Sequence, residues 1–335
     1  MKILVTGAAG FIGHHVATSL LARGDEVLGI DSLNDYYDPA LKLARIERLR
    51  AHDRFAFEKM DLSDRSAVGV LRDRGIDRIV HLAAQAGVRH SIEQPFDYLD
   101  ANLAATLVIL ELARAIETSH LVFASSSSVY GLNEVMPFAT EHPVDHPLSL
   151  YAATKRSGEL MAHGYARLYG IPTTGLRFFS VYGTWGRPDM ALWKFADAIR
   201  EGRPIELYNH GRHRRDFTWI DDVVDGLLRV LDQPAAPDPE FDPANPRLDR
   251  SDAPFRLYNL GNDTNVDLLR FVGLIEEAMG RKAETILLPK QPGDVEASAA
   301  DVGPMRREFG WEPTTPVEVG VPTFIDWWLK WVERA

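Results

Sequence analysis

The sequence contains no cysteine, which excludes disulfides, cysteine nucleophiles and thiolate metal sites. A protein without disulfides fits a reducing compartment, so we expect a cytoplasmic location. No uncharged apolar run reaches the ~20 residues that a membrane span needs. The opening segment MKILVTGAAG has too short an apolar stretch for a signal peptide, and it predicts a buried first strand instead.

Positive charge is also scarce, because 37 Lys and Arg residues face 48 Asp and Glu residues, for a formal net charge of -11. Binding to a phosphate backbone needs a broad basic surface, so nucleic acid is not an expected partner. His14 and His15 lack metal-ligand spacing with other ligating residues, and no metal site is expected. The chain of 335 residues is long enough to bury a large core and to form more than one domain.

Apolar runs alternate with amphipathic segments through the first half of the chain. The expected strands are Ile3–Thr6, Glu26–Ile30, Phe55–Met60, Arg78–Leu82, Leu121–Ser125 and Thr174–Phe179. The expected helices are Ile12–Arg23, Pro39–Ala51, Ser63–Arg72, Asn102–Ile116 and Tyr151–Tyr169. This alternation predicts an α/β fold in which helices cover both faces of a doubly wound, Rossmann-type parallel sheet.

The pattern changes after Phe179, where turn-rich segments, a helix over Met190–Glu201, short strands and further helices follow. We expect these segments to form a smaller, discontinuous α/β domain. The expected division assigns residues 1–180 and 215–262 to the larger domain, and 181–214 and 263–335 to the smaller one. The Pro- and Asp-rich stretch 233–254 is expected to be an exposed excursion.

The segment TGAAGFIG places Gly7, Gly10 and Gly13 directly after the first expected strand and at the start of a helix. Glycines in this context let the backbone turn tightly and approach a pyrophosphate, which the free N–H groups of the helix then bind. Asp31 ends the second strand, where a carboxylate meets the adenosine ribose and repels a ribose phosphate. The cofactor expected is therefore NAD and not NADP. The alternative is a turn-forming Asp31.

Tyr151 and Lys155 stand i, i+4 in YAATK, which puts them on one face of a helix. A free tyrosine has a pKa of about 10 and is a poor base at neutral pH. We expect the Lys155 ammonium and a positive nicotinamide ring to lower the pKa of Tyr151. The strand end FASSSSVYG supplies Ser125 to Ser128 as hydroxyl donors near the reacting oxygen. By itself a Tyr/Lys pair is usually a surface feature, but the preceding motifs favour catalysis.

These motifs together resemble the extended short-chain dehydrogenase/reductase family, in which nucleotide-sugar epimerases and dehydratases use NAD. The resemblance extends over nearly the whole chain and includes HLAAQAGVRHS, SSSSVYG, RFFSVYG, RRDFTWIDD and YNLG. Within the family, three further segments look most like the UDP-glucuronate 4-epimerases. They are GIDSLNDYYDPALKLARIERL, GTWGRPDMALWKF and QPGDV.

The resemblance implies roles for individual residues. The residues implied to hold NAD are Gly7, Gly10, Phe11, Ile12, Gly13, Asp31, Ser32, Asn34, Asp61, Leu62, Leu82, Ala83, Ala84, Gln85, Asn102, Tyr151, Lys155 and Val181. Catalysis is assigned to Tyr151, Lys155 and Ser126. The residues implied to contact the substrate are Arg89, Ser127, Ser128, Ser180, Arg187, Tyr208, Arg215, Gln291 and Asp294.

The implied substrate contacts differ in chemistry. Ser180 and Arg187 match positions that face a sugar carboxylate, and Tyr208 matches an aromatic that stacks on uracil. Arg215, Gln291 and Asp294 are implied to address the diphosphate and the uridine ribose. In the basic run Arg212 to Arg215, we expect Arg212 and Arg214 to be solvated.

Departures from relatives narrow the implied reaction. Dehydrating relatives carry an Asp-Glu pair just before the VYG-like triplet, where this sequence has Ser127 and Ser128. Decarboxylating relatives typically carry a Glu where Ser128 stands. Many UDP-glucose 4-epimerases begin their last diphosphate motif with Arg, where this sequence has Gln291.

The resemblance therefore implies 4-epimerisation of UDP-glucuronate to UDP-galacturonate through a 4-keto intermediate, with NAD recycled. The alternatives are a UDP-glucose or UDP-N-acetylglucosamine 4-epimerase, a UDP-glucuronate decarboxylase, and a cofactor-binding regulator without catalysis. The resemblance also implies a homodimer that packs through the helices near Asn102–Ile116 and Tyr151–Tyr169.

Overall fold

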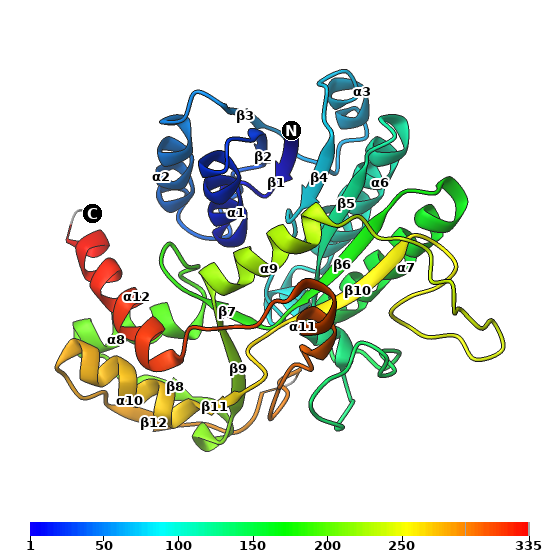
Figure 1. Cartoon of the computed structure of the whole chain (residues 1–335). Helices are drawn as coiled ribbons and strands as arrows, with labels where there is room; N and C mark the ends of the chain where they lie inside the picture. The colour runs from blue at the N-terminus through cyan, green and yellow to red at the C-terminus, as the bar shows by residue number, and fades with distance from the viewer. Residues whose placement is uncertain (292, 334–335) are drawn as a thin grey trace.

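The computed structural model describes residues 1–291 and 293–333, and its central element is a parallel sheet of seven strands in the order β10-β6-β5-β4-β1-β2-β3 (Figure 1). The strands are β1 (Lys2–Thr6), β2 (Glu26–Asp31), β3 (Phe55–Lys59), β4 (Arg78–His81), β5 (His120–Ser126), β6 (Thr173–Phe178) and β10 (Phe255–Leu260). The six strands expected from the sequence are confirmed, and β10 adds a seventh beside β6. The order reverses between β1 and β4, which is where such sheets bind ligands.

Two helical layers cover this sheet. On one face α1 (Phe11–Ala22) packs against α2 (Pro39–Arg50) and α9 (Ile220–Asp232). On the other face α6 (Ala105–Ala115) packs against α3 (Ala67–Leu71) and α7 (Leu150–Tyr169). The buried side chains of β1 alternate accordingly, since Ile3 and Val5 join the first core and Leu4 joins the second.

Short helical segments connect β4 and β5 to these layers. They are α4 (His90–Glu93), α5 (Pro95–Tyr98), the π-helix η1 (Leu99–Ala104) and the 3-10 turn η2 (Ser127–Tyr130). The helix expected over Asn102–Ile116 therefore begins as a π-helix that continues into α6.

A second, smaller group of elements lies below the sheet in Figure 1. It contains a three-stranded sheet, β11-β9-β7, and a two-stranded sheet, β12-β8. Its strands are β7 (Ser180–Tyr182), β8 (Ile205–Leu207), β9 (Arg214–Trp219), β11 (Asn265–Asp267) and β12 (Thr285–Leu287). Its helical segments are α8 (Ala191–Glu201), η3 (Tyr208–Gly211), α10 (Leu268–Met279), α11 (Gly303–Phe309) and α12 (Val317–Val332). The boundary expected at residue 215 falls inside β9.

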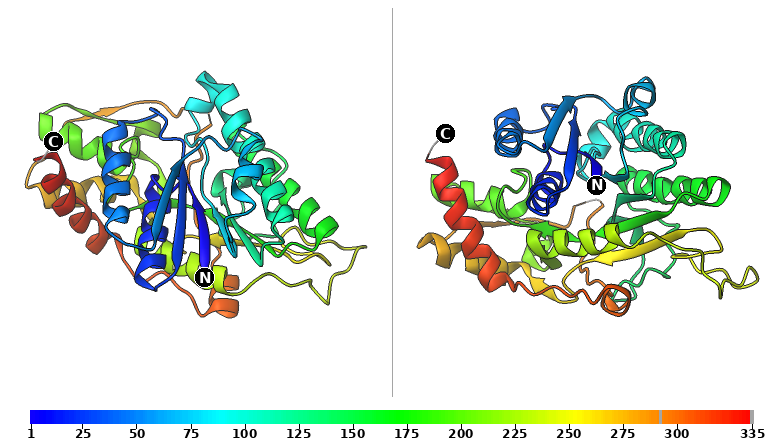
Figure 2. Two further views of the ribbon diagram at one scale, coloured as in Figure 1. Left: turned by 90° about the horizontal axis from the view of Figure 1, so that it is seen from above. Right: turned by 45° about the horizontal axis from the view of Figure 1, so that its top comes forward.

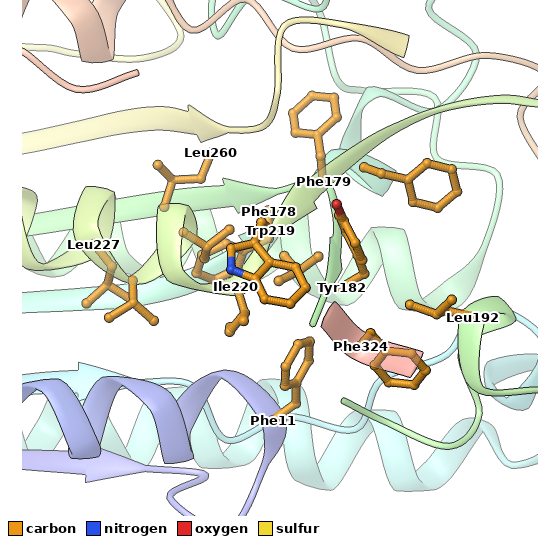
Figure 3. Close-up of a cluster of buried hydrophobic side chains, with 14 of the residues drawn as sticks. Phe11, Phe178, Phe179, Tyr182, Leu192, Trp219, Ile220, Leu227, Leu260 and Phe324 are labelled. Carbon is orange, nitrogen blue, oxygen red and sulfur yellow. The ribbon is translucent and has the colours of Figure 1, made fainter. Parts of the chain in front are cut away.

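The two groups of elements share one hydrophobic core. Figure 3 shows Phe11 of α1 close to Trp219, Ile220 and Phe324 of α12, and all four are buried members of one cluster. The further views of Figure 2 show α12 lying along the outside of the second group. This continuous core fixes the second group against the sheet, so the space between them has a defined shape.

Local signals explain where α7 begins and ends. The Ser149 hydroxyl accepts a hydrogen bond from the Ala152 amide at 3.1 Å, which satisfies one of the four unpaired N–H groups at the start of the helix. Gly170 ends the helix in the left-handed conformation, with φ of +67°. These two caps place Tyr151 in the first turn of α7.

Among the described residues, no helix is both long and apolar enough to cross a membrane.

Candidate active site

A large cavity opens at the carboxyl ends of β1, β2, β4 and β5, where the sheet order reverses. Seventeen of the eighteen residues that the sequence assigned to NAD line this cavity. They are Gly7, Gly10, Phe11, Ile12, Gly13, Asp31, Ser32, Asn34, Asp61, Leu62, Leu82, Ala83, Ala84, Gln85, Tyr151, Lys155 and Val181. Segments far apart in the sequence therefore meet in one place.

The glycine turn between β1 and α1 leaves no room for side chains. Gly7 has φ of +70°, and a Cβ added there would lie 2.8 Å from the Ala83 nitrogen. A Cβ on Gly13 would lie 2.1 Å from the Gly7 oxygen. Gly10, the residue before α1, supplies no side-chain cap to the first amides of the helix, and it lines the cavity. This arrangement fits a pyrophosphate.

Asp31 makes the turn contacts that the sequence analysis gave as the alternative, and it also lines the cavity. Its Oδ2 accepts a hydrogen bond from the Ala9 amide at 3.1 Å, and its Oδ1 accepts one from the Leu33 amide at 2.9 Å. The carboxylate thus holds the glycine turn and shapes its own loop, while it still lines the cavity.

Asn102 is the one assigned cofactor residue that does not line the cavity. It is buried in η1, where its Oδ1 accepts a hydrogen bond from the Gln85 amide at 2.8 Å. Its Nδ2 donates to the Gln85 oxygen at 3.1 Å and to the Thr154 hydroxyl at 3.0 Å. Asn102 therefore fixes the loop after β4 against α7.

Tyr151 and Lys155 line the cavity together with Ser126 at the end of β5. Burial raises the pKa of the Tyr151 phenol, and the Ser126 hydroxyl and the Arg187 guanidinium act in the opposite direction. Lys155, which the sequence expects to lower this pKa together with a nicotinamide ring, is not among these groups. Lys155 Nζ lies 5.9 Å from the centre of the Tyr151 ring and donates to the Ala124 oxygen at 3.0 Å.

Lys155 is itself shifted by its surroundings. Burial lowers the pKa of its ammonium to about 8, because the charged form loses its hydration. Tyr98, which the sequence did not single out, packs edge-on against Tyr151 with ring centres 6.1 Å apart. The helix α7 therefore places the buried phenol of Tyr151 and the buried amine of Lys155 in one cavity.

The four serines at the end of β5 and the start of η2 do not share one role. Ser125 lines the first cavity, but its hydroxyl donates to Glu159 Oε1 at 2.6 Å, so its one proton is already used. Ser127 and Ser128 begin the turn η2 and line neither of the two cavities. Ser126 lines the first cavity and donates to the Ser128 hydroxyl at 3.2 Å.

A second cavity lies between α8, β9 and α10, and Met190 lines both cavities. Five of the assigned substrate residues line it, namely Arg89, Ser180, Tyr208, Arg215 and Asp294. The Arg89 guanidinium lies 4.3 Å over the centre of the Tyr208 ring, and its Nη2 lies 3.6 Å from Asp294 Oδ2. Cationic and aromatic groups thus meet where a uracil and a diphosphate are expected.

Other residues of the basic run and the last motif lie around this second cavity. Arg212 and Arg214 are exposed, as expected, and Arg214 pairs with Asp267 at 3.2 Å. His213 is buried and lines the cavity, which the sequence reading missed. Gln291 does not line either cavity, and its neighbour at 292 lies outside the described residues.

Arg187 lines the first cavity and not the second, so it faces the same space as Tyr151. Its Nε and Nη2 donate to the two carboxylate oxygens of Asp189 at 2.9 and 2.5 Å. The sequence reading missed Asp189 and Tyr36, whose hydroxyl donates to Asp189 at 3.2 Å. The Arg-Pro-Asp order in GTWGRPDM was the available signal for Asp189, whereas Tyr36 reaches it only through the fold.

No group of three or more His, Asp or Glu side chains among the described residues is placed to hold a metal ion.

A profile of the family described as NAD dependent epimerase/dehydratase matches residues 3–242. The chain belongs to this family. The family expected from the sequence is confirmed, and the glycine turn, Asp31 and the Tyr151 helix all lie within the matched residues. NAD is the cofactor on which members of the family depend.

Relatives and solved structures in the family agree over the whole chain. A probable UDP-glucuronate 4-epimerase of Rhizobium meliloti is 47% identical over 342 residues, which cover 100% of this chain and 99% of the relative. The UDP-glucuronic acid 4-epimerase of Bacillus cereus, solved with UDP-glucuronic acid and NAD, superposes with a TM-score of 0.88 at 32% identity, covering 99% of this chain and 100% of that one.

A neutral-sugar enzyme of the family is also similar. The UDP-glucose 4-epimerase of Thermotoga maritima, solved with UDP-glucose, superposes with a TM-score of 0.84 at 27% identity and covers 99% of this chain and 100% of its own.

Proposed function

We propose that the protein is an NAD-dependent UDP-glucuronate 4-epimerase that forms UDP-galacturonate. The observation that carries the substrate assignment is that Tyr151 and Arg187 line one cavity. A guanidinium matches a carboxylate in charge and in planar geometry, so it suits the acid group of the sugar. The named relatives at up to 47% identity support the same substrate class.

The residues that line the first cavity fit NAD. The evidence for this fit is the tight glycine turn between β1 and α1, which leaves no room for side chains beside a pyrophosphate. The seventeen lining residues named above would hold it, with Asn102 fixing the loop that carries Gln85. When bound, NAD supplies the means to oxidise and later reduce one sugar carbon.

Side chains of the protein transfer the protons. Tyr151 Oη takes the proton of the 4-hydroxyl and returns it after the sugar has turned within the pocket. Ser126 donates a hydrogen bond to the same sugar oxygen, and the Lys155 ammonium, held by the Ala124 oxygen, adds positive charge to the same cavity. The sugar passes through a 4-keto form.

The second cavity would hold the UDP part of the substrate. Tyr208 stacks on uracil, Arg89 and Arg215 meet the diphosphate, and Asp294 and Gln291 address the ribose. Burial lowers the pKa of Arg215, and the nearby Asp294 carboxylate counteracts this shift in part. An anionic ligand would stabilise the charged guanidinium further, which suits Arg215 to this role.

A 4-keto uronic acid is a β-keto acid, which loses carbon dioxide when the C5–C6 bond stands perpendicular to the carbonyl. Arg187, which lines the first cavity, and Ser180, which lines the second, would together hold the carboxylate in another orientation. We expect Arg187→Ala to release UDP-pentose products, which NMR detects. A variant that is merely slower and evolves no carbon dioxide would contradict this role.

Incubation of the purified protein with UDP-glucuronate, followed by NMR of the products, tests the whole proposal. UDP-galacturonate supports it, and UDP-xylose identifies a decarboxylase. Turnover of UDP-glucose or UDP-N-acetylglucosamine alone identifies a neutral-sugar epimerase. No turnover of any UDP-sugar identifies a protein that binds its cofactor without catalysis.

The domain division and the assembly also belong to this proposal. We propose a nucleotide-binding domain of residues 1–180 and 215–262 and a substrate domain of 181–214 and 263–335.

We further propose a homodimer, because α7 and the neighbouring η1 and α6 expose large apolar side chains. These are Leu99, Leu107, Leu160 and Leu168. A second copy packed on this face would form a four-helix bundle. The cytoplasmic location stays a prediction.

A further inference from the structure

Arg187 is held from one side by an acidic neighbour. The two hydrogen bonds to Asp189 use Nε and Nη2, which form one edge of the guanidinium plane. Both side chains are about three-quarters buried, at 23% and 22% exposure, so solvent screens this ion pair only in part. Burial disfavours the charged forms, yet their attraction raises the pKa of Arg187 and lowers that of Asp189, so the pair stays charged.

Further contacts fix this pair in place. The Tyr36 hydroxyl, from the loop between β2 and α2, donates to Asp189 Oδ2 at 3.2 Å. The fully buried Arg45 donates to the Trp185 oxygen at 2.5 Å and to the Gly186 oxygen at 2.9 Å, directly before Arg187. The guanidinium of Arg187 therefore has a set position and a charge that its neighbour offsets.

This arrangement leaves one edge of Arg187 for a ligand. Among the described residues, the hydrogen bonds of its side chain go to Asp189 alone and do not use Nη1. A carboxylate at that edge is attracted by the guanidinium and repelled by Asp189. The net attraction is smaller than that of an isolated guanidinium in the same partly buried place.

We propose that Asp189 determines how tightly the protein holds an acidic sugar, by offsetting the charge of Arg187 so that the sugar can turn between the two proton-transfer orientations. This inference rests on the proposed function. An Arg187 without Asp189 would bind the carboxylate of the starting sugar more tightly. Tighter binding of the ground state lowers KM without raising kcat, and it opposes the turning of the sugar.

The test is Asp189→Asn in the full-length protein, with affinities measured by calorimetry for UDP-glucuronate and UDP-glucose. We expect UDP-glucuronate to bind roughly 5–10-fold more tightly and UDP-glucose to change by less than about twofold. The kcat for UDP-glucuronate falls while its KM also falls. The gain in affinity shrinks at high salt, because it is electrostatic.

Two further variants isolate the effect of charge. Asp225→Asn removes the same group from an exposed pair with Arg229, at 2.9 Å on α9 and outside both cavities, and it leaves both affinities unchanged. Tyr36→Phe breaks the hydrogen bond to Asp189 but keeps the carboxylate charge. We expect it to leave the ratio of the two affinities unaltered.

Weaker binding of UDP-glucuronate to Asp189→Asn would overturn the inference, because Asp189 would then only orient Arg187. An equal change for both sugars, or the same shift in Tyr36→Phe, would also overturn it. The affinities need no turnover, so they test Asp189 even if the wild-type protein does not convert UDP-glucuronate. That last result would defeat the proposed function alone.

Discussion

At the residue scale, neighbouring groups shift the pKa of the Tyr151 phenol in opposite directions. Burial raises its pKa, and the Ser126 hydroxyl and the positive charge of Arg187 lower it. The phenolate is the form that accepts a proton, so activity rises with pH toward this pKa.

Removing the Arg187 charge should therefore move the rising limb of the pH profile of kcat/KM. We expect Arg187→Ala to shift this limb to higher pH, because the Tyr151 pKa rises when the positive charge is lost. Arg187→Lys keeps the charge and should shift the limb less. A limb that stays in place or moves to lower pH in Arg187→Ala would show that Arg187 does not act on the phenol.

The glycine turn between β1 and α1 leads to a second prediction at the residue scale. A Cβ on Gly13 would lie 2.1 Å from the Gly7 oxygen, so the turn must shift in Gly13→Ala. We expect at least ~10-fold weaker NAD binding, measured by titration of the stripped protein and by the nucleotide that co-purifies.

Gly273→Ala on α10 is the matched control, because a Cβ there has open space around it. We expect it to keep NAD and to gain up to about 1 kcal/mol in the free energy of unfolding. Unaltered NAD binding by Gly13→Ala would mean that the pyrophosphate does not use this turn.

The sequence predicted the residues of the first cavity well, because glycine turns and strand ends are local signals. It did not predict that the four serines have different partners, since the Ser125 hydroxyl donates to Glu159, a residue 34 positions away. It placed Lys155 beside the Tyr151 phenol from helical spacing, but a strand carbonyl takes the ammonium. Such competition between partners depends on the tertiary structure.

At the element scale, a buried charged network fastens the catalytic helix α7 to the sheet. Glu159 of α7 accepts hydrogen bonds from Arg177 of β6 at 2.8 and 3.0 Å, and both side chains are fully buried. Burial raises the pKa of the Glu159 carboxyl, but attraction to Arg177 outweighs burial and lowers it overall.

Breaking this network should be costly. We expect Arg177→Met to lower the free energy of unfolding by about 3–5 kcal/mol, because it leaves the Glu159 charge buried without its main partner. Urea denaturation measures this loss. In the wild type, the folded pKa of Glu159 lies below the unfolded one, so its stabilisation is present above the unfolded pKa and is lost as pH falls through the folded one. A stability equal to that of the wild type would contradict the role of the network.

At this scale, helices and strands could be predicted where their hydrophobic pattern extended over many residues. Alternating strands and helices indicated the seven-stranded sheet except for β10, which follows a long excursion. The three-residue strands β7 and β11 were not predictable individually, because they are too short to show alternation and form only by pairing with β9. The helix α12 begins at Val317 and continues through Pro322, although a proline usually marks a helix boundary.

At the scale of the whole molecule, the proposed homodimer rests on the exposed apolar face of α6 and α7. Leu168 on α7 is 73% exposed in the single chain. We expect Leu168→Glu to convert a dimer into a monomer in light scattering, because the charge would have to be buried in the interface.

Val319→Glu is the control for that experiment. Val319 is 55% exposed on α12, away from the proposed dimer face, so its variant should keep the mass of the wild type. A monomeric wild-type protein would reject the dimer directly.

The two cavities that share Met190 have a kinetic consequence. If the nucleotide stays anchored in the second cavity, the sugar ring can leave the first cavity without leaving the protein. The oxidised ring is then tethered, and its return is an intramolecular event with a high effective concentration. Escape of a reactive keto sugar would be governed by how long the uridine end stays bound. Variants at Arg215 should therefore leak oxidised sugar before they lose the ability to bind it.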